Sequence, residues 1–331
     1  MSNLSRKRIA ILIMLASFIL ITFTLNISFG PVPIDSRLLW EIILGRETSG
    51  PLVQIVWQVR FPRTMAALLV GMALAASGTV LQGVMQNPLA APSLIGVNAG
   101  AGLAAMLVFA FLPGRVGLVV PGAFIGALLA LGIILLITSR TSGDRSTLIL
   151  AGVAVSAMLG AGTDTIRLLY PDAMLGATTF MIGGFANTSW SRIAFALPWL
   201  IGSLGIVLLT GPILNVVGLG DEVALSLGVP VRQVRLALLA LSAVLAGSSV
   251  SIAGLLGFIG LIVPHASRLL LGNDQRWLLP GTMLLGGGFV LACDLVSRLL
   301  FAPYELPVGI LLSFLGGPFF IILLLRTRRE T

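Results

Sequence analysis

The sequence predicts an all-α integral membrane protein whose subunit crosses the bilayer about ten times. Three observations lead to this fold class. Hydrophobic residues make up 57% of the 331 positions and charged residues only 10%, whereas an ordinary soluble domain carries about 25% charged residues. Apolar stretches of the roughly 20 residues that a spanning helix needs follow one another along the chain. The first of them, 9–29, begins directly after a basic N-terminal segment. A soluble enzyme and a disordered protein are therefore excluded.

Hydropathy divides the chain into spans that belong to one polytopic membrane domain, residues 1–331. The candidate spans are 9–29, 62–84, 93–112, 117–138, 146–168, 193–214, 235–256, 258–271, 278–300 and 307–325. An even number of spans places both termini on one side of the membrane. Basic residues at both ends of the chain predict that this side is the cytoplasm. Small residues four positions apart, at Gly71/Ala75, Gly96/Gly100 and Gly122/Gly126, predict closely packed helices.

Two segments are too short or too irregular for a full crossing. The span 258–271 carries Pro264 and His265, and the stretch 171–184 is a partial apolar segment on the periplasmic side. Broken segments at membrane depth occur where the backbone lines a cavity enclosed by protein. We therefore expect these two segments to lie beside such a cavity.

The loop 216–235 is the most distinctive segment on the cytoplasmic side. Asp221 and Glu222 suit the first turn of a short helix, and Gly228 followed by Pro230 ends it. Ala224, Leu225 and Leu227 give this helix an apolar edge. A short amphipathic helix is suited to the groove of a partner protein. The alternative is a capped loop with no partner.

The rare residue types exclude several kinds of chemistry. Cys293 and His265 are the single cysteine and histidine, so the chain cannot form an internal disulfide or a zinc cluster. Lys7 is the single lysine and is followed by arginine, so the ATP-binding motif GxxxxGK[ST] does not occur. Any ATP hydrolysis therefore requires a separate subunit. The excess of arginine is explained by membrane-flanking loops, which leaves no reason to expect nucleic acid as a partner.

Five sequence motifs occur in a specific order. They are RFPR at 60–63, NPLAAP at 87–92, GDEVALSLG at 220–228, GFIGLIVPHASR at 257–268 and ELPVG at 305–309. In this order they resemble the FecCD-type permease family, the membrane subunits of ABC importers for ferric siderophores, haem and vitamin B12. The resemblance extends from about Pro51 to Leu325.

The resemblance implies the fold, the partners and the location. The family fold is a ten-helix subunit that dimerises, with an identical or a different permease subunit, around a central translocation path. Two ATP-binding subunits lie on the cytoplasmic side, and a periplasmic or lipid-anchored substrate-binding protein docks on the other. The protein is then a multi-pass protein of the cytoplasmic (inner) membrane that catalyses no reaction itself and needs no cofactor or metal. A ferric siderophore is the substrate that the resemblance favours; haem, cobalamin or another metal chelate stay open.

The resemblance also implies three sets of site residues. The ATPase-coupling set is Gly220, Asp221, Ala224, Leu227 and Gly228. The set for docking the binding protein is Arg60, Arg63 and Arg298, which could otherwise be arginines that snorkel to the membrane interface. The translocation gate is Ser146 and Thr147; Arg145 directly before them departs from the small hydroxyl residues of the family, and Ser146 could instead cap a helix.

Two pairs of charges within the spans leave a second class of function open. Asp164 precedes Arg167 by three positions, and Asp294 precedes Arg298 by four. An unpaired charge at the centre of the bilayer costs roughly 2.5–3.5 kcal/mol, so we expect both pairs to form locally. A role in proton transfer is the alternative, and it would make the protein an ion-coupled secondary transporter. His265 is expected to be structural.

Overall fold

The computed structural model describes residues 3–141 and 145–327, and these ranges are almost entirely helical. The helices are α1 (Asn3–Ser28), α2 (Ser36–Ile43), α3 (Pro51–Gln54), α4 (Phe61–Met85), α5 (Val97–Phe111), α6 (Val119–Ser139), α7 (Arg145–Leu169), α8 (Pro171–Ile182), α9 (Trp190–Leu209), α10 (Gly211–Val217), α11 (Asp221–Ser226), α12 (Val231–Ala253), α13 (Ile259–Leu271), α14 (Gln275–Leu299) and α15 (Val308–Thr327). A π-helical segment, Ile55–Arg60, joins α3 to α4, and short 3₁₀ turns precede α5 and α6.

The membrane-spanning helices agree with the predicted number. Within the described ranges, seven helical segments are long and apolar enough to cross a membrane, and α5, α13 and α15 are shorter apolar helices. Together they correspond one to one to the predicted spans. The fold class is confirmed, and α13, with Pro264 inside it, is the short helix that the sequence predicted.

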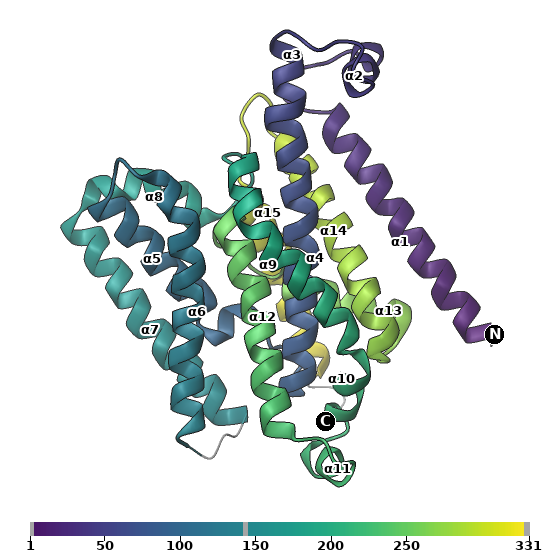
Figure 1. Cartoon of the computed structure of the whole chain (residues 1–331), viewed down its shortest axis with the longest axis vertical. Coiled ribbons are helices and arrows are strands. Elements are labelled where there is room, and N and C mark those ends of the chain that lie inside the picture. The colour runs from purple at the N-terminus through teal and green to yellow at the C-terminus, as the bar shows by residue number, and fades with distance from the viewer. Residues whose placement is uncertain (1–2, 142–144, 328–331) are drawn as a thin grey trace.

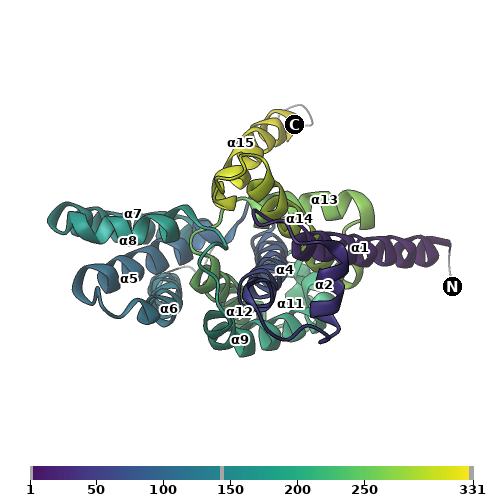
Figure 2. The same ribbon diagram turned by 90° about the horizontal axis from the view of Figure 1, so that it is seen from above.

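The bundle is built around α4 (Figure 1). Helix α4 packs most extensively against α14 and α12, and α13 and α9 also contact it. Helices α5–α8 form a second group to one side, α1 lies along the outside of α14, and α15 projects from the bundle (Figures 1 and 2). The interior position of α4 explains why its residues are mostly buried, whereas α1 and α7 leave most of their surface free for lipid or another subunit.

Small residues allow the central helices to approach closely. Gly71 and Ala75 of α4 face Gly286 of α14, and Gly100 of α5 faces Gly126 of α6. A Cβ atom built on Gly78 would lie only 2.1 Å from the carbonyl oxygen of Gly260, so no larger residue fits there without displacing α13. The predicted packing through small residues is confirmed at these contacts.

Several helix boundaries differ from the predicted spans, and the second and sixth spans differ for a clear reason. The second span is longer, because helical structure runs without a break from Pro51 to Met85. Pro62 lacks the N–H that an α-helix needs, and the π-helical turn directly before α4 accommodates it. The sixth span is shorter: α9 ends at Leu209, and Pro212 starts the separate helix α10. The partial segment predicted at 171–184 forms the helix α8.

The two ends of the bundle carry different short helices (Figure 1). We call the end with α10 and α11 the α11 end, and the end with α2 and α3 the α2 end. Helix α1 begins and α15 ends in the half of the molecule nearer the α11 end (Figure 1). That both termini lie on the cytoplasmic side of the membrane stays a prediction.

Candidate functional site

Helix α11 presents an apolar surface away from the bundle. Val223, Leu225 and Leu227 are 44%, 59% and 61% exposed. Ala224 is instead fully buried and anchors the helix to the bundle. The predicted short helix therefore exists. Its exposed apolar residues are Val223, Leu225 and, directly after its end, Leu227. The prediction that Ala224 belongs to this edge is wrong, because Ala224 packs inward.

The ends of α11 are fixed by glycine and by an ion pair. Gly220 and Gly228 have φ angles of +110° and +80°, which favour glycine over any residue with a side chain. The Asp221 carboxylate accepts a hydrogen bond of 2.6 Å from Nη2 of Arg235 in α12. These features hold α11 at a defined angle to the bundle, so its apolar face has a fixed direction.

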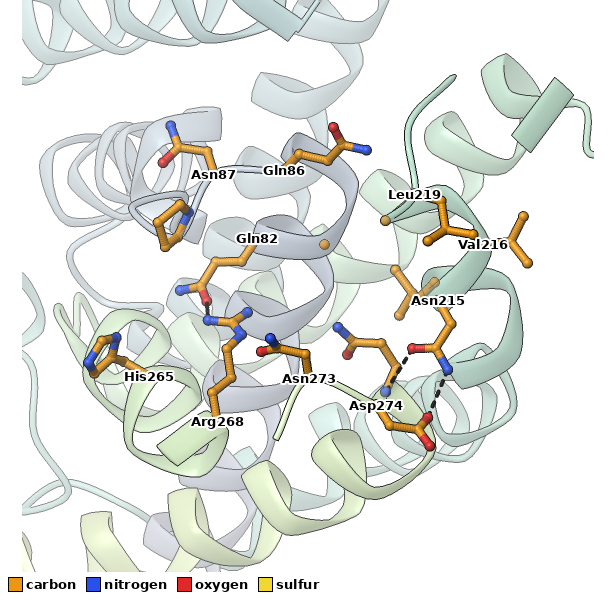
Figure 3. Close-up of a pocket in the computed structure, with 15 residues that line it drawn as sticks. Gln82, Gln86, Asn87, Asn215, Val216, Leu219, His265, Arg268, Asn273 and Asp274 are labelled. Carbon is orange, nitrogen blue, oxygen red and sulfur yellow. Dashed lines mark hydrogen bonds between the residues drawn. The ribbon is translucent and has the colours of Figure 1, made fainter. Parts of the chain in front are cut away.

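A polar pocket of about 760 Å³ lies beside α11, where the ends of four helices meet (Figure 3). Its polar lining is Gln82 from α4, Gln86 and Asn87 directly after it, Asn215 from α10, His265 and Arg268 from α13, and Asn273, Asp274 and Gln275 from the turn before α14 and its first residue. The Arg268 guanidinium donates to Oε1 of Gln82 across the pocket. The His265 ring packs edge-on against Phe319 of α15.

Asp274 joins three helices at the rim of this pocket. Its carboxylate accepts a hydrogen bond of 2.8 Å from Nδ2 of Asn215, and it caps α14 through the backbone N–H of Arg276. Nη1 of Arg8 in α1 lies 3.8 Å from Oδ2. Burial works against the charged carboxylate, but these hydrogen bonds and the charges of Arg276 and Arg8 hold the pKa of Asp274 below its usual value. Asp274 therefore connects α10 to α14 and α1 through a charged side chain, and α10 in turn leads to α11.

The three arginines predicted to dock the binding protein, Arg60, Arg63 and Arg298, lie together at the α2 end. We call these arginines and their polar neighbours Asp294, Glu305 and Asn26 the arginine cluster. The Asp294 carboxylate contacts Nη2 of Arg63 at 3.0 Å and Nε of Arg298 at 3.2 Å. Glu305 contacts Nη1 of Arg63 at 2.6 Å. The predicted pair of Asp294 with Arg298 is formed, and Arg63 joins it from another helix.

The guanidinium groups of the cluster are turned inward. Arg60, Arg63 and Arg298 are only 3%, 7% and 2% exposed. Nη1 of Arg60 donates to the carbonyl oxygens of Ile27 and Ser28 at 2.7 and 2.8 Å, and Arg298 donates to Asn26. A cavity of about 190 Å³ lies against the cluster. The structure thus brings the three predicted arginines together, and their guanidinium groups form hydrogen bonds and ion pairs with other groups of the same chain.

The remaining predicted residues lie on α7. Ser146 and Thr147 are in its first turn, at the end of the bundle that also carries α11; Ser146 is exposed and Thr147 is half-buried. The side chain of Arg145 lies outside the described residues. At the other end of α7, Asp164 and Arg167 form the predicted pair at 3.3 Å, with 72% and 42% of their side chains exposed.

Sequence reasoning missed the polar pocket. Gln82 and Gln86, four residues apart at the end of a span, were a local signal of a polar helix face. Their meeting with Asn215, Arg268 and Asp274 depends on the packing of four helix ends and has no signal in the sequence.

Comparisons with known proteins cover almost the whole chain. The model of the FecCD transport family matches residues 18–326. The hemin transport system permease protein HmuU of Yersinia pestis is 40% identical over 309 residues, which cover 92% of this chain and 91% of that protein. The iron(3+)-hydroxamate import system permease protein FhuB of Bacillus subtilis is 38% identical over 334 residues, 98% of this chain and 86% of that protein.

A solved structure has the same fold. It is an inward-facing conformation of an ABC transporter described as of the metal-chelate type, with a TM-score of 0.83 and 30% sequence identity. The match covers 96% of this chain and 99% of the solved chain. The arrangement of helices is therefore shared over nearly the full length of both chains.

Proposed function

Because this chain belongs to the FecCD transport family, and is therefore a membrane permease subunit of an ABC importer for iron chelates, haem or cobalamin, we propose that its own substrate is a ferric siderophore. The observation that carries this proposal is the alignment with the iron(3+)-hydroxamate permease over 98% of the chain. Haem is the second candidate, since the hemin permease is 40% identical. The family membership does not support the alternative of an ion-coupled secondary transporter.

Uptake by the reconstituted transporter tests the substrate. Proteoliposomes that contain the permease and its ATPase subunit, with the binding protein added, are offered a radio-iron hydroxamate siderophore, hemin and cobalamin in parallel. We expect ATP-dependent accumulation of the siderophore at least about tenfold above the other two, because a tenfold preference requires only about 1.4 kcal/mol of selectivity. Accumulation of hemin alone would replace the siderophore by haem as the substrate.

The α11 end faces the cytoplasm and receives the ATPase subunit. The exposed apolar face of Val223, Leu225 and Leu227 supports this assignment, because such a face suits the groove of a partner protein. The fixed ends of α11, with the coupling residues Gly220, Asp221, Ala224, Leu227 and Gly228, make the helix a rigid contact. Movement of the ATPase subunits then reaches the bundle through α10 and α11.

The arginine cluster attracts the substrate-binding protein at the α2 end. Its three arginines and two carboxylates leave one net positive charge, and a positive surface increases the association rate of an acidic partner. Since the guanidinium groups already have partners within the chain, they act through their electric field more than through direct hydrogen bonds.

Replacing Arg60 by glutamine tests this electrostatic role. Arg60 donates mainly to backbone carbonyls, to which a shorter amide can still donate. We expect the association rate of the binding protein to fall on the order of twofold to tenfold at low salt and to match the wild type at high salt, where screening removes the field. Arg37→Gln is the control, because the Arg37 side chain is 86% exposed at the same end. If the association rate at low salt falls equally in both variants, or in neither, the arginine cluster has no specific role in attracting the binding protein.

Ser146 and Thr147 form the constriction at the inner end of the translocation path, where the two permease subunits meet. In a Cys293→Ser background, Ser146→Cys or Thr147→Cys is expected to crosslink two identical subunits and to block uptake, because small residues allow the helices to approach each other. Transport and crosslinking are measured before and after reduction. Crosslinking without any loss of uptake would place the gate elsewhere.

A further inference from the structure

The polar pocket beside α11 contains Arg268, which forms no ion pair with a carboxylate of the residues that the structure describes. Within the described residues, the hydrogen-bond partner of the Arg268 guanidinium is the neutral amide of Gln82. Asp274 lines the same pocket, but its carboxylate faces Asn215, Arg8 and Arg276. A partly buried charge is stabilised best by an opposite charge. Arg268 therefore has room for an acidic partner from outside the chain.

A second polar group in the pocket has no hydrogen-bond partner among the described residues. Oε1 of Gln275 is buried without a hydrogen bond, and the residue is only 8% exposed. A buried acceptor without a donor is energetically unfavourable. The pocket thus offers a guanidinium donor to a carboxylate and a carbonyl acceptor to an N–H group, a combination that suits an acidic side chain carried on a peptide.

The pocket is continuous with the surface of α11. Gln86 and Leu219 line both this pocket and the hollow of about 480 Å³ that is formed by the start of α11 and Arg235. Figure 3 shows Gln86 and Leu219 toward one side of the pocket and Arg268, bonded to Gln82, toward the other. A protein that docks on α11 therefore also covers the opening of the pocket.

We propose that this pocket receives an acidic side chain of the ATPase subunit, whose carboxylate pairs with Arg268. The proposal rests on the docking of that subunit on α11. It adds a second contact, which is electrostatic and specific, to the apolar contact made by the helix. A charge-assisted hydrogen bond in a partly dry pocket is among the stronger polar contacts between proteins.

Binding of the purified ATPase subunit to the permease in nanodiscs tests the pair. We expect Arg268→Gln to weaken binding on the order of 10-fold to 100-fold at low salt and to reduce its salt dependence. Arg268→Lys should restore part of the loss. Arg232→Gln is the matched control, because Arg232 is an exposed arginine at the same end that donates to the backbone of Ser139; it should change binding less than about twofold.

A second variant leaves the interior of the pocket unchanged. Asn273 lies exposed at the opening. Asn273→Glu should weaken binding by repelling the incoming carboxylate and by attracting Arg268, and Asn273→Lys should strengthen it. Binding that is the same in wild type, Arg268→Gln and Asn273→Glu would overturn the proposal.

Two further measurements separate the possible failures. If Leu227→Asp abolishes binding and the pocket variants do not, the pocket proposal fails and the role of α11 stands. If Leu227→Asp leaves binding intact, docking on α11 itself fails. Citrate is the probe for a small anion, and the fluorescence of Trp277 reports its binding. If citrate changes this fluorescence, Arg268→Gln removes the change, and ATPase binding is the same in both proteins, the pocket is a site for a soluble carboxylate. That result would overturn the proposal.

Discussion

Exchange of Leu227 for aspartate is expected to reduce ATP hydrolysis that is stimulated by substrate to the level of the isolated ATPase subunit, while the permease stays folded and inserted. Leu227 is 61% exposed, so the substitution removes little packing within the chain. In the docked complex its burial contributes about 2 kcal/mol, and a carboxylate in the same groove adds a desolvation cost. Together these effects weaken docking at least on the order of 100-fold.

The control for this variant is a leucine with the same exposure at the opposite end. Leu44 follows α2 and is 62% exposed. Leu44→Asp should leave docking and coupled ATP hydrolysis unchanged. Both variants are compared by copurification of the ATPase subunit and by ATPase assays with and without loaded binding protein. Full stimulation in Leu227→Asp would exclude α11 as the coupling helix.

Replacement of Asp294 by asparagine is expected to cause the largest loss of stability of any single substitution in the arginine cluster. Asp294 is completely buried between Arg63 and Arg298. Asparagine keeps the size of the side chain but leaves two buried guanidinium groups with Glu305 as the one acidic neighbour among the described residues. Breaking a buried ion pair in this way costs about 3–5 kcal/mol.

Unfolding in detergent by heat or denaturant measures this cost. Asp164→Asn is the matched control, because Asp164 pairs with Arg167 at the exposed surface of α7 and such pairs contribute at most about 1 kcal/mol. The double variant Asp294→Asn with Arg298→Gln should regain part of the stability. Equal stability of the two asparagine variants would show that the charges of the cluster are not coupled.

The sequence predicts the spanning helices well, because the bilayer imposes a length and a composition on each of them. It also predicts α11, since Asp221 at the start and Gly228 after the end are local signals. The extension of the second span to Pro51 was missed, because Gln54, Gln58 and Arg60 interrupt the apolar pattern there. A π-helical turn has no hydropathy signal of its own.

The site residues could be predicted in part. The pair of Asp294 with Arg298 follows from their spacing on one helix. The contact of Asp294 with Arg63 joins residues 231 positions apart and depends on the packing of α4 against α14. Hydropathy gives the depth of an arginine in the membrane but not the direction of its side chain, which is why three arginines expected at a docking surface lie inside.

The position of α4 has a mechanical consequence. Arg63 belongs to the arginine cluster and Gln82 to the polar pocket, and the two residues lie roughly 28 Å apart along one regular helix. Glycine contacts to α13 and α14 hold this helix along its length. A tilt of α4 by about 5° around its midpoint would therefore carry both side chains about 1.2 Å in opposite directions. That displacement is enough to break a hydrogen bond at each end, so a tilt of α4 would change the arginine cluster and the polar pocket together.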